Sequence, residues 1–351
     1  MTKKQSAAAD TIVVILAAGK GTRMGRSDMG KVCFEIDGVP AINRIIRAFK
    51  GEGLSRFLLV VGTRADQVME TVNWEHSDVL YVYQQPPLGT GHAARVAADA
   101  LSTLGYDGNV LITMGDKHVE GEAIRTLMDA FVRQQADLAL LTIPKSKAGT
   151  DASGRVFLDR TGQALDIIEK TDLARQAVAD ELRQQLDRGR PVGAEAIRQL
   201  ISRWIPNPAK QAVAMGDLLE LAAAEGPVDR ARLEQSLGAP KYNLCIGGRN
   251  YAAAEIERLC KGVNPSLYLF RSAALYEGIR LIDNDNAQHE YYLTDIVRHL
   301  AALRTPAGRP KCRVRAVPIA DARLIQGFNS PEELLAIQEY IRRRKSPRRK
   351  P

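Results

Sequence analysis

The sequence lacks the features that mark several common classes of protein. Its 351 residues include four cysteines, which show neither the Cys-x-x-Cys spacing of a zinc site nor the density of a disulfide framework. No stretch approaches the ~20 apolar residues that span a bilayer. The early apolar run ends in Gly-Lys-Gly-Thr-Arg, which is not a signal-peptide cleavage site. We therefore expect a cytoplasmic protein that does not contact the membrane.

Most of the chain also carries little net charge. The formal net charge is +8, but seven positive charges lie between Arg342 and Lys350, so the rest of the chain is nearly neutral. A basic end of this kind is typical of a solvated terminus. We expect no specific nucleic-acid partner, a disordered basic tail over residues 341–351 and a disordered N-terminus over residues 1–10.

The chain does contain a regular alternation of apolar runs and helical patterns from residue 11 to about residue 170. This order predicts an α/β fold with a Rossmann-like, doubly wound, mostly parallel sheet. In such sheets, ligands bind beyond the carboxyl ends of the strands. The predicted strands are Ile12–Leu16, Phe57–Val61, Val79–Tyr83, Val110–Thr113 and Leu138–Thr142, and the predicted helices are Ala41–Gly51, Ala93–Leu104 and Ala123–Gln135.

The pattern then changes to short helices separated by proline and glycine. Four of them are expected, at Ala174–Gln185, Ala194–Trp204, Ala209–Ala224 and Asp229–Leu237. We interpret residues 171–240 as a helical insertion in a single domain of residues 11–340. A strand at Ser266–Phe270 and a helix at Pro331–Arg343 complete the domain, and the sequence shows no internal repeat.

Two overlapping segments look like phosphate-binding loops. Residues 25–31 spell Gly-x-x-x-x-Gly-Lys, but Val32 stands where a P-loop has Ser or Thr, and no strand leads directly into Gly25. Gly19 and Gly21 instead follow the first strand, where their amides can approach a polyphosphate closely. The alternative is an ordinary glycine-rich turn.

Polar residues follow three further strands or loops. Gln84 and the Gly89-Thr90-Gly91 turn suit a pyrimidine edge, Asp116 suits a Mg²⁺ that also contacts phosphates, and the Asp and Asn residues of 283–286 could complete its shell. Each segment also reads as a helix cap. The fold predicts that they converge.

Together these segments resemble the uridyltransferase half of bacterial bifunctional UDP-N-acetylglucosamine pyrophosphorylases, which are sugar nucleotidyltransferases. The resemblance runs in order from about residue 11 to residue 340, outside the insertion. It is carried by Leu-Ala-Ala-Gly-Lys-Gly-Thr-Arg-Met at 16–24, Ser-Asp-x-x-Lys-Val at 27–32, Leu-Gly-Thr-Gly-His-Ala at 88–93, Gly-Asp at 115–116, Gly-Arg-Val at 154–156, Ile-Glu-Lys at 168–170 and Asn-Ala-Gln-x-Glu-Tyr-Tyr-x-Thr-Asp at 286–295. It implies a nucleotide-diphospho-sugar transferase fold.

The resemblance implies a role for each matched residue. Gly19 and Arg23 would bind the triphosphate and Lys31 the region of the α-phosphate, and Arg23 and Lys31 would be catalytic. The other implied roles are uracil binding for Gln84, Gly89 and Thr90; amino-sugar binding for Gly154, Glu169 and Asn264; and Mg²⁺ binding for Asp116 and Asn286.

The implied reaction transfers UMP from UTP to N-acetylglucosamine 1-phosphate and releases pyrophosphate. The attacking phosphate oxygen is already an anion, so positioning and charge neutralisation by Mg²⁺, Arg23 and Lys31 would suffice without a general base. Two alternatives remain open: the same chemistry with CTP, dTTP or another phosphorylated acceptor, and a catalytically silent regulatory protein that binds nucleotide sugars. A dinucleotide-dependent oxidoreductase is least favoured, because Met24 stands where its third glycine belongs.

The sequence departs from the family pattern in four ways. Gly30 replaces a proline, which we expect to loosen Lys31, and Lys117-His118 replace an apolar-Pro pair, which puts a second cation beside the phosphates. The insertion separates Glu169 from Asn264, and we expect its helices to act as a lid over the acceptor. We expect the family's left-handed β-helix domain to be absent and the protein to be a monomer or dimer without acetyltransferase activity.

Overall fold

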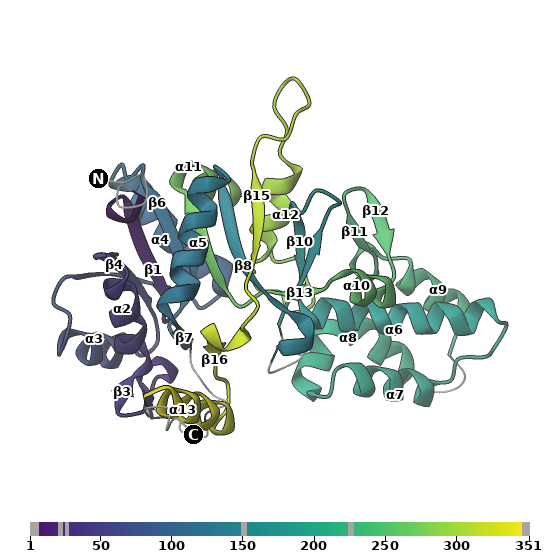
Figure 1. Ribbon diagram of the computed structural model, residues 1–351. Helices are drawn as coiled ribbons and strands as arrows, with labels where there is room; N and C mark the ends of the chain where they lie inside the picture. The colour runs from purple at the N-terminus through teal and green to yellow at the C-terminus, as the bar shows by residue number, and fades with distance from the viewer. Residues whose placement is uncertain (1–6, 20–23, 25–27, 149–152, 224–227, 346–351) are drawn as a thin grey trace, which may run out of the picture.

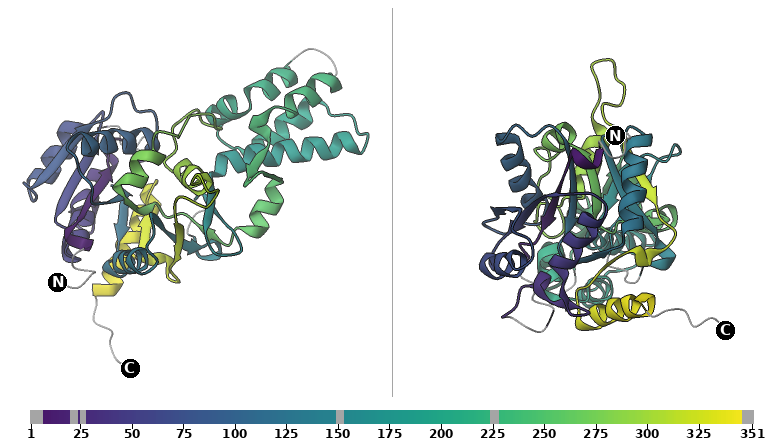
Figure 2. Two further views of the ribbon diagram at one scale, coloured as in Figure 1. Left: turned by 90° about the horizontal axis from the view of Figure 1, so that it is seen from above. Right: turned by 60° about the vertical axis from the view of Figure 1, so that its left-hand side comes forward.

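The computed structural model describes residues 7–19, 24, 28–148, 153–223 and 228–345. In this part of the chain, helices cover both faces of a central sheet, and a helical lobe projects from one end of it (Figures 1 and 2). The first strands of the sheet and the helical lobe lie at opposite ends of the molecule.

The central sheet has the strand order β10-β9-β13-β8-β14-β6-β1-β4-β5, and β15 pairs with β8. Strands β5, β4, β1 and β6 are parallel neighbours, whereas β14 runs antiparallel between β6 and β8. All five predicted strands are present, with ends shifted by two residues at most, and the doubly wound α/β fold is confirmed. The strands are β1 Thr11–Leu16, β4 Arg56–Val61, β5 Val79–Tyr83, β6 Asn109–Met114, β8 Leu138–Pro144, β9 Arg155–Leu158, β10 Ala164–Ile168, β13 Gly262–Val263, β14 Leu267–Arg271 and β15 Val314–Pro318.

Strand β1 shows why the apolar runs are continuous rather than alternating. Val13 and Ile15 pack into one core, while Ile12, Val14 and Leu16 pack into the other, on the opposite face of the sheet. Three helices cover each face. They are α2 Ala41–Gly51, α3 Ala65–Asn73 and α5 Gly121–Arg133 on the first, and α4 Thr90–Thr103, α11 Ser272–Gly278 and α12 Asp295–Ala302 on the second.

The helical insertion has a hydrophobic core of its own. Its four helices were all predicted, and they surround buried side chains that include Leu182, Ile201 and Leu218. Pro206 follows the end of α7, and Asp229 caps α9 by accepting hydrogen bonds from the backbone of residues 231 and 232. The helices are α6 Lys170–Asp187, α7 Ala194–Trp204, α8 Pro208–Ala223 and α9 Arg230–Leu237.

A hairpin and a short helix, which the sequence did not predict, lead from the insertion back to the sheet. They are β11 Leu244–Ile246, β12 Arg249–Tyr251 and α10 Ala253–Leu259. Their buried side chains pack with Phe157 of β9 and Leu173 of α6. The insertion is therefore fixed to the sheet at its base.

Both termini are more ordered than expected in their described parts. Residues 7–9 form a helical turn, Ala7 and Ala8 pack on the core, and Thr11 Oγ1 donates to the Ala7 carbonyl at 2.6 Å. At the other end, helix α13 Pro331–Lys345 runs past the expected boundary at 341. The predicted disorder therefore does not hold for residues 7–10 or 341–345.

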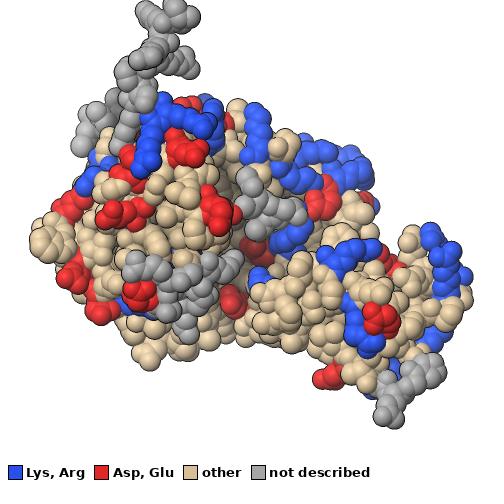
Figure 3. Space-filling model, turned by 90° about the horizontal axis from the view of Figure 1, so that it is seen from below, with Lys and Arg blue, Asp and Glu red and all other residues tan. Residues whose placement is uncertain are grey.

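The described helices include none that is long and apolar enough to cross a membrane. On the face shown in Figure 3, Lys and Arg as well as Asp and Glu occur on both lobes.

Candidate functional site

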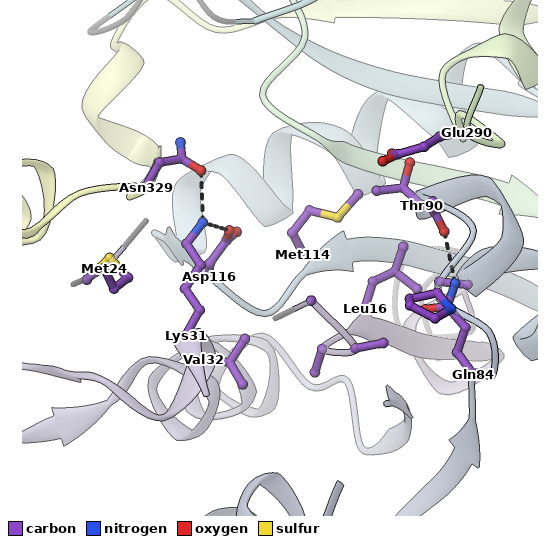
Figure 4. Close-up of a pocket in the computed structure, with 16 residues that line it drawn as sticks. Leu16, Met24, Lys31, Val32, Gln84, Thr90, Met114, Asp116, Glu290 and Asn329 are labelled. Atoms are coloured by element: carbon purple, nitrogen blue, oxygen red, sulfur yellow. Dashed lines mark hydrogen bonds and ion pairs between the residues drawn. The ribbon is translucent and has the colours of Figure 1, made fainter. Parts of the chain in front are cut away.

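A cavity of 560 Å³ lies beyond the carboxyl ends of β1 and β6, and Figure 4 shows its lining. The chain passes from β1 to β4 on one side, while β6 flanks β1 on the other, so this is the point at which the strand order reverses. The Gly115 amide donates to the Leu16 carbonyl at 2.9 Å and joins the two strand ends. We call this space the nucleotide cavity, because ligands of α/β sheets bind at such points. Six predicted site residues line it: Gly19, Lys31, Gln84, Gly89, Thr90 and Asp116.

Gly19 and Met24 are the described residues of the loop after β1 that bear on the phosphate-binding prediction. A Cβ atom built on Gly19 would meet no atom of the described residues within 4 Å, so these residues leave room for a ligand to approach the backbone there. Met24 is buried and lines the same cavity. Arg23, the other predicted phosphate contact of this loop, lies outside the described residues.

Lys31 is held between two polar side chains. Its ammonium forms an ion pair with Asp116 Oδ2 and donates to Asn329 Oδ1 at 2.9 Å (Figure 4). The Phe328 ring centroid lies 5.4 Å from Nζ. Burial would raise the pKa of Asp116, but Lys31 and Lys117 outweigh it and lower that pKa below its ordinary value. Asp116 is therefore a carboxylate at neutral pH.

Gly30 does not loosen Lys31 in the way the sequence suggested. Its φ of −63° and ψ of 135° are values that a proline could also adopt. Its amide, which a proline would lack, donates to Gln67 Oε1 at 2.5 Å. This hydrogen bond ties the start of the Lys31–Cys33 turn to helix α3.

Gln84 is buried in the lining of the nucleotide cavity, where two contacts hold its side chain. Its Nε2 donates to the Gly89 carbonyl at 3.0 Å and lies 3.1 Å from His92 Nδ1. Thr90 begins helix α4, and its Oγ1 accepts from the Leu293 amide at 3.2 Å.

Two motifs are more specific than the others to the family that the sequence resembles, and they pack directly against each other. The Gly91 amide donates to the Tyr291 carbonyl at 2.7 Å, and the Tyr291 amide donates to the Leu88 carbonyl at 2.8 Å. A Cβ on Gly89 or Gly91 would lie within 3.0 Å of Tyr291 backbone atoms. These glycines therefore permit close backbone approach between segments 88–93 and 286–295.

Asp116 fits a metal ligand, whereas Asn286 is committed elsewhere. Asp116 Oδ1 is buried and has no hydrogen-bond partner in the described part of the chain, so one carboxylate oxygen is free for a cation. Asn286 Oδ1 accepts from the amides of Gln288 and Glu290, its Nδ2 donates to the Glu290 carbonyl, and it lines a different cavity. Its metal role stays a prediction. The second carboxylate among the described residues that line the nucleotide cavity is Glu290.

The three residues predicted to contact the sugar lie together. Gly154, Glu169 and Asn264 line a second cavity of 420 Å³, which we call the acceptor cavity. The Asn264 amide donates to the Gly154 carbonyl at 3.0 Å, and Thr294 Oγ1 donates to Glu169 Oε1 at 2.9 Å. A Cβ on Gly154 would lie 3.3 Å from that same Oε1.

Strand pairing explains how these residues meet across the insertion. Val263 of β13 pairs with Arg155 of β9, which places Asn264 next to Gly154. Glu169 follows β10, the antiparallel partner of β9. The sheet therefore restores the neighbourhood that the insertion interrupts in the sequence.

Behind Glu169 lies a group of buried carboxyl groups. Burial raises the pKa of Glu169 to about 7, with Asp172 adding to the effect, and raises the pKa of Asp166 to about 6. It also raises the pKa of Asp295 to about 7, and the nearby carboxyl groups reinforce this shift. Arg298 opposes the shifts at Asp166 and Asp295 but does not cancel them. These carboxyl groups therefore stay protonated at pH values well above those at which Asp and Glu ordinarily ionise.

A third cavity of 240 Å³ adjoins both of the others. It shares Thr90, Met114 and Asp116 with the nucleotide cavity, and Lys117, Glu169 and Asn264 with the acceptor cavity. We call it the junction cavity. The described residues of the insertion helices line none of these three cavities, so they do not form the expected lid in this conformation.

Sequence reasoning missed Asn329, Glu290 and Thr294 as site residues. Asn329 comes from the segment before α13, which returns to the site because β16 Ile325–Gly327 pairs antiparallel with β7 Lys117–Val119. The Ser-Pro that follows Asn329 marks the start of a helix, but no local pattern shows that this turn lies beside Lys31.

Comparison with known proteins agrees with this geometry. Residues 13–203 match the model of the MobA-like NTP transferase domain, which is more than half of the chain. Similar curated proteins are the "Bifunctional protein GlmU" of Geobacter metallireducens, at 29% identity over 95% of this chain and 51% of the relative, and that of Hyphomonas neptunium, at 34% identity over 64% and 46%. The chain spans about half the length of the curated relatives it matches.

A solved structure of "HddC from Yersinia pseudotuberculosis complexed with GMP-PN" has the same fold. Its TM-score is 0.51 at 15% identity, with 94% of this chain and 99% of that chain covered. The family match, supported by the cavity at the switch point of the sheet, identifies an enzyme that transfers nucleotidyl groups. The chain belongs to the MobA-like NTP transferase domain family.

Proposed function

We propose that the protein transfers UMP from UTP to N-acetylglucosamine 1-phosphate and forms UDP-N-acetylglucosamine and pyrophosphate. The observation that carries this proposal is the convergence of Gly154, Glu169 and Asn264 in one cavity, although the insertion lies between the last two. The junction cavity shares lining residues with this space and with the nucleotide cavity. The family match and the curated relatives support sugar nucleotidyl transfer in general, and the choice of UTP and N-acetylglucosamine 1-phosphate is our proposal.

The reacting groups would meet in the junction cavity. The triphosphate would extend from the turn at Gly19 toward Lys31, while Gln84, Gly89 and Thr90 would line the space for the base. The acceptor would enter from the side of Glu169. Its phosphate oxygen attacks the α-phosphorus, the bond to the pyrophosphate oxygen breaks, and Lys31 stabilises negative charge in the transition state.

A divalent cation, which we infer to be Mg²⁺, would be held by Asp116 through the carboxylate oxygen for which the described residues provide no partner. When bound, it would neutralise charge on the phosphates. Glu290, which lines the same cavity as Asp116, is one candidate for a further ligand. Asn286 is the other, and it would have to give up the hydrogen bonds within its own loop to bind the cation. Asn329 positions Lys31 and keeps its ammonium directed into the site when Asp116 binds the cation.

A substrate screen tests this proposal. UTP, CTP, dTTP and GTP are each incubated with a panel of sugar 1-phosphates and Mg²⁺, and pyrophosphate release is measured. A clear preference for UTP with N-acetylglucosamine 1-phosphate supports the proposal. Preference for another pair would replace it with the same chemistry on other substrates. Turnover with no pair would favour a silent protein that binds nucleotide sugars.

A further inference from the structure

Lys117 is a cation for which the described residues provide no hydrogen bond and no ion pair. Burial lowers the pKa of the Lys117 ammonium, and Asp116, Lys31 and Glu333 act on it only through charge at a distance. Lys31, in contrast, contacts both Asp116 and Asn329. Lys117 is half-buried, so its charge is partly removed from water without a direct counter-ion. An anionic ligand would supply the missing partner.

The backbone directs Lys117 and its neighbour to different surroundings. Lys117 and His118 are consecutive in strand β7, so their side chains point to opposite sides. His118 is buried, lies 3.0 Å from Glu120 and packs edge-on against Tyr340 of α13. Lys117 lines both the acceptor cavity and the junction cavity.

Gly327 makes room for the Lys117 side chain. The two residues pair across β7 and β16. A Cβ on Gly327 would lie 2.6 Å from Lys117 Nζ and 3.0 Å from its Cδ, so the lysine side chain runs over the glycine. The ammonium is thereby held against the cavity wall. An alanine at 327 would displace it without removing its charge.

We propose that Lys117 binds the phosphate group of the acceptor, and that this chain selects phosphate monoesters through it. The proposal rests on the proposed function, in which two phosphate-bearing substrates must approach each other. Lys31 faces the nucleotide cavity and Lys117 the acceptor cavity, and both flank Asp116. Each substrate therefore meets its own cation, which reduces the repulsion between the two anions.

Kinetics of four variants, with Lys147→Met as a further comparison, test the assignment. Lys117→Met should raise the KM for the acceptor about tenfold or more, the scale of one charge-assisted hydrogen bond, while the KM for the nucleotide changes less than about twofold. Gly327→Ala should shift the acceptor KM in the same direction, and Lys117→Arg should recover most of the loss. Lys311→Met, which removes an exposed cation paired with Glu277, is the charge-matched control and should have no effect.

Three kinetic results would overturn the proposal. One is an equal rise in both KM values for Lys117→Met, because a purely structural role would affect both substrates. The second is an unchanged acceptor KM. The third is a larger loss from Lys147→Met, since Lys147 is exposed at the edge of the acceptor cavity and would then be the phosphate contact.

Calorimetric titration separates this proposal from the proposed function. Inorganic phosphate is the probe, and no turnover is needed. Wild type should bind it at least about tenfold more tightly than Lys117→Met, and a neutral sugar should show no such difference. Equal phosphate affinity would refute the role of Lys117 even in an active enzyme. A tenfold difference in a protein that fails the substrate screen would support Lys117 while rejecting the proposed reaction.

Discussion

Asp295→Asn should reduce the loss of stability that accompanies a rise in pH. Burial raises the pKa of Asp295 from 3.8 to about 7, and those of Asp166 and Glu169 to about 6 and about 7. The folded chain therefore holds protons that the unfolded chain releases near its ordinary carboxyl pKa. Stability is greatest below that value, falls as the pH rises toward the folded pKa, and becomes level above it.

The shifts set the size of the effect. For Asp295 the difference of about 3 pH units, at about 1.4 kcal/mol for each unit, bounds the loss at about 4 kcal/mol. The three carboxyl groups repel one another when ionised, so their separate losses do not add. Asparagine cannot ionise, and it also removes one like charge from Asp166 and Glu169. The variant should match wild type at about pH 4 and exceed its stability at about pH 8.

Urea unfolding at these two pH values measures the difference. The chain has two tryptophans, Trp74 after α3 and Trp204 in the insertion, so single Trp→Phe backgrounds report on the sheet and the insertion separately. Glu70→Gln removes an exposed carboxylate on α3 and serves as the matched control. Equal loss of stability between the two pH values in wild type and Asp295→Asn would refute the reasoning.

Four further substitutions test the site and its scaffold. Asp116→Asn should remove nearly all Mg²⁺-dependent pyrophosphate release while circular dichroism stays unchanged, because the free carboxylate oxygen loses its charge; near-normal release would exclude Asp116 as a metal ligand. Asn329→Ala should lower kcat/KM about tenfold, because Lys31 keeps its ion pair with Asp116. Lys31→Ala should lower it about 100-fold. Equal losses for the two variants would contradict a positioning role for Asn329. Gly91→Ala should destabilise the protein by about 1–3 kcal/mol and lower its thermal midpoint. The reason is that the new Cβ would lie 2.5 Å from Ile282 Cδ1 and 2.9 Å from the Tyr291 carbonyl oxygen. An unchanged midpoint would show that segment 286–295 can move away.

The sequence by itself determined strands β1, β4, β5, β6, β8 and β14, helices α2, α4, α5 and α13, the four helices of the insertion, and most of the nucleotide cavity. Buried strands such as β1 and β4 are continuous apolar runs, and the helices between them have apolar residues at helical spacing, so both can be recognised locally. The carboxyl ends of parallel strands then bring the following loops together. For that reason Gly19, Gln84 and Asp116 could be assigned to one cavity before any tertiary contact was known.

Only the tertiary structure decided the antiparallel pairings and the contacts that depend on them. The pairing of β13 with β9 joins Asn264 to Gly154 across the insertion, and the pairing of β16 with β7 brings Asn329 to Lys31. Such pairings link residues far apart in the chain, and local periodicity does not encode which edges meet. For Asn286, the local sequence likewise does not show which groups the side chain binds. Its amide oxygen accepts hydrogen bonds from the backbone of its own loop, a competition that only the folded geometry resolves.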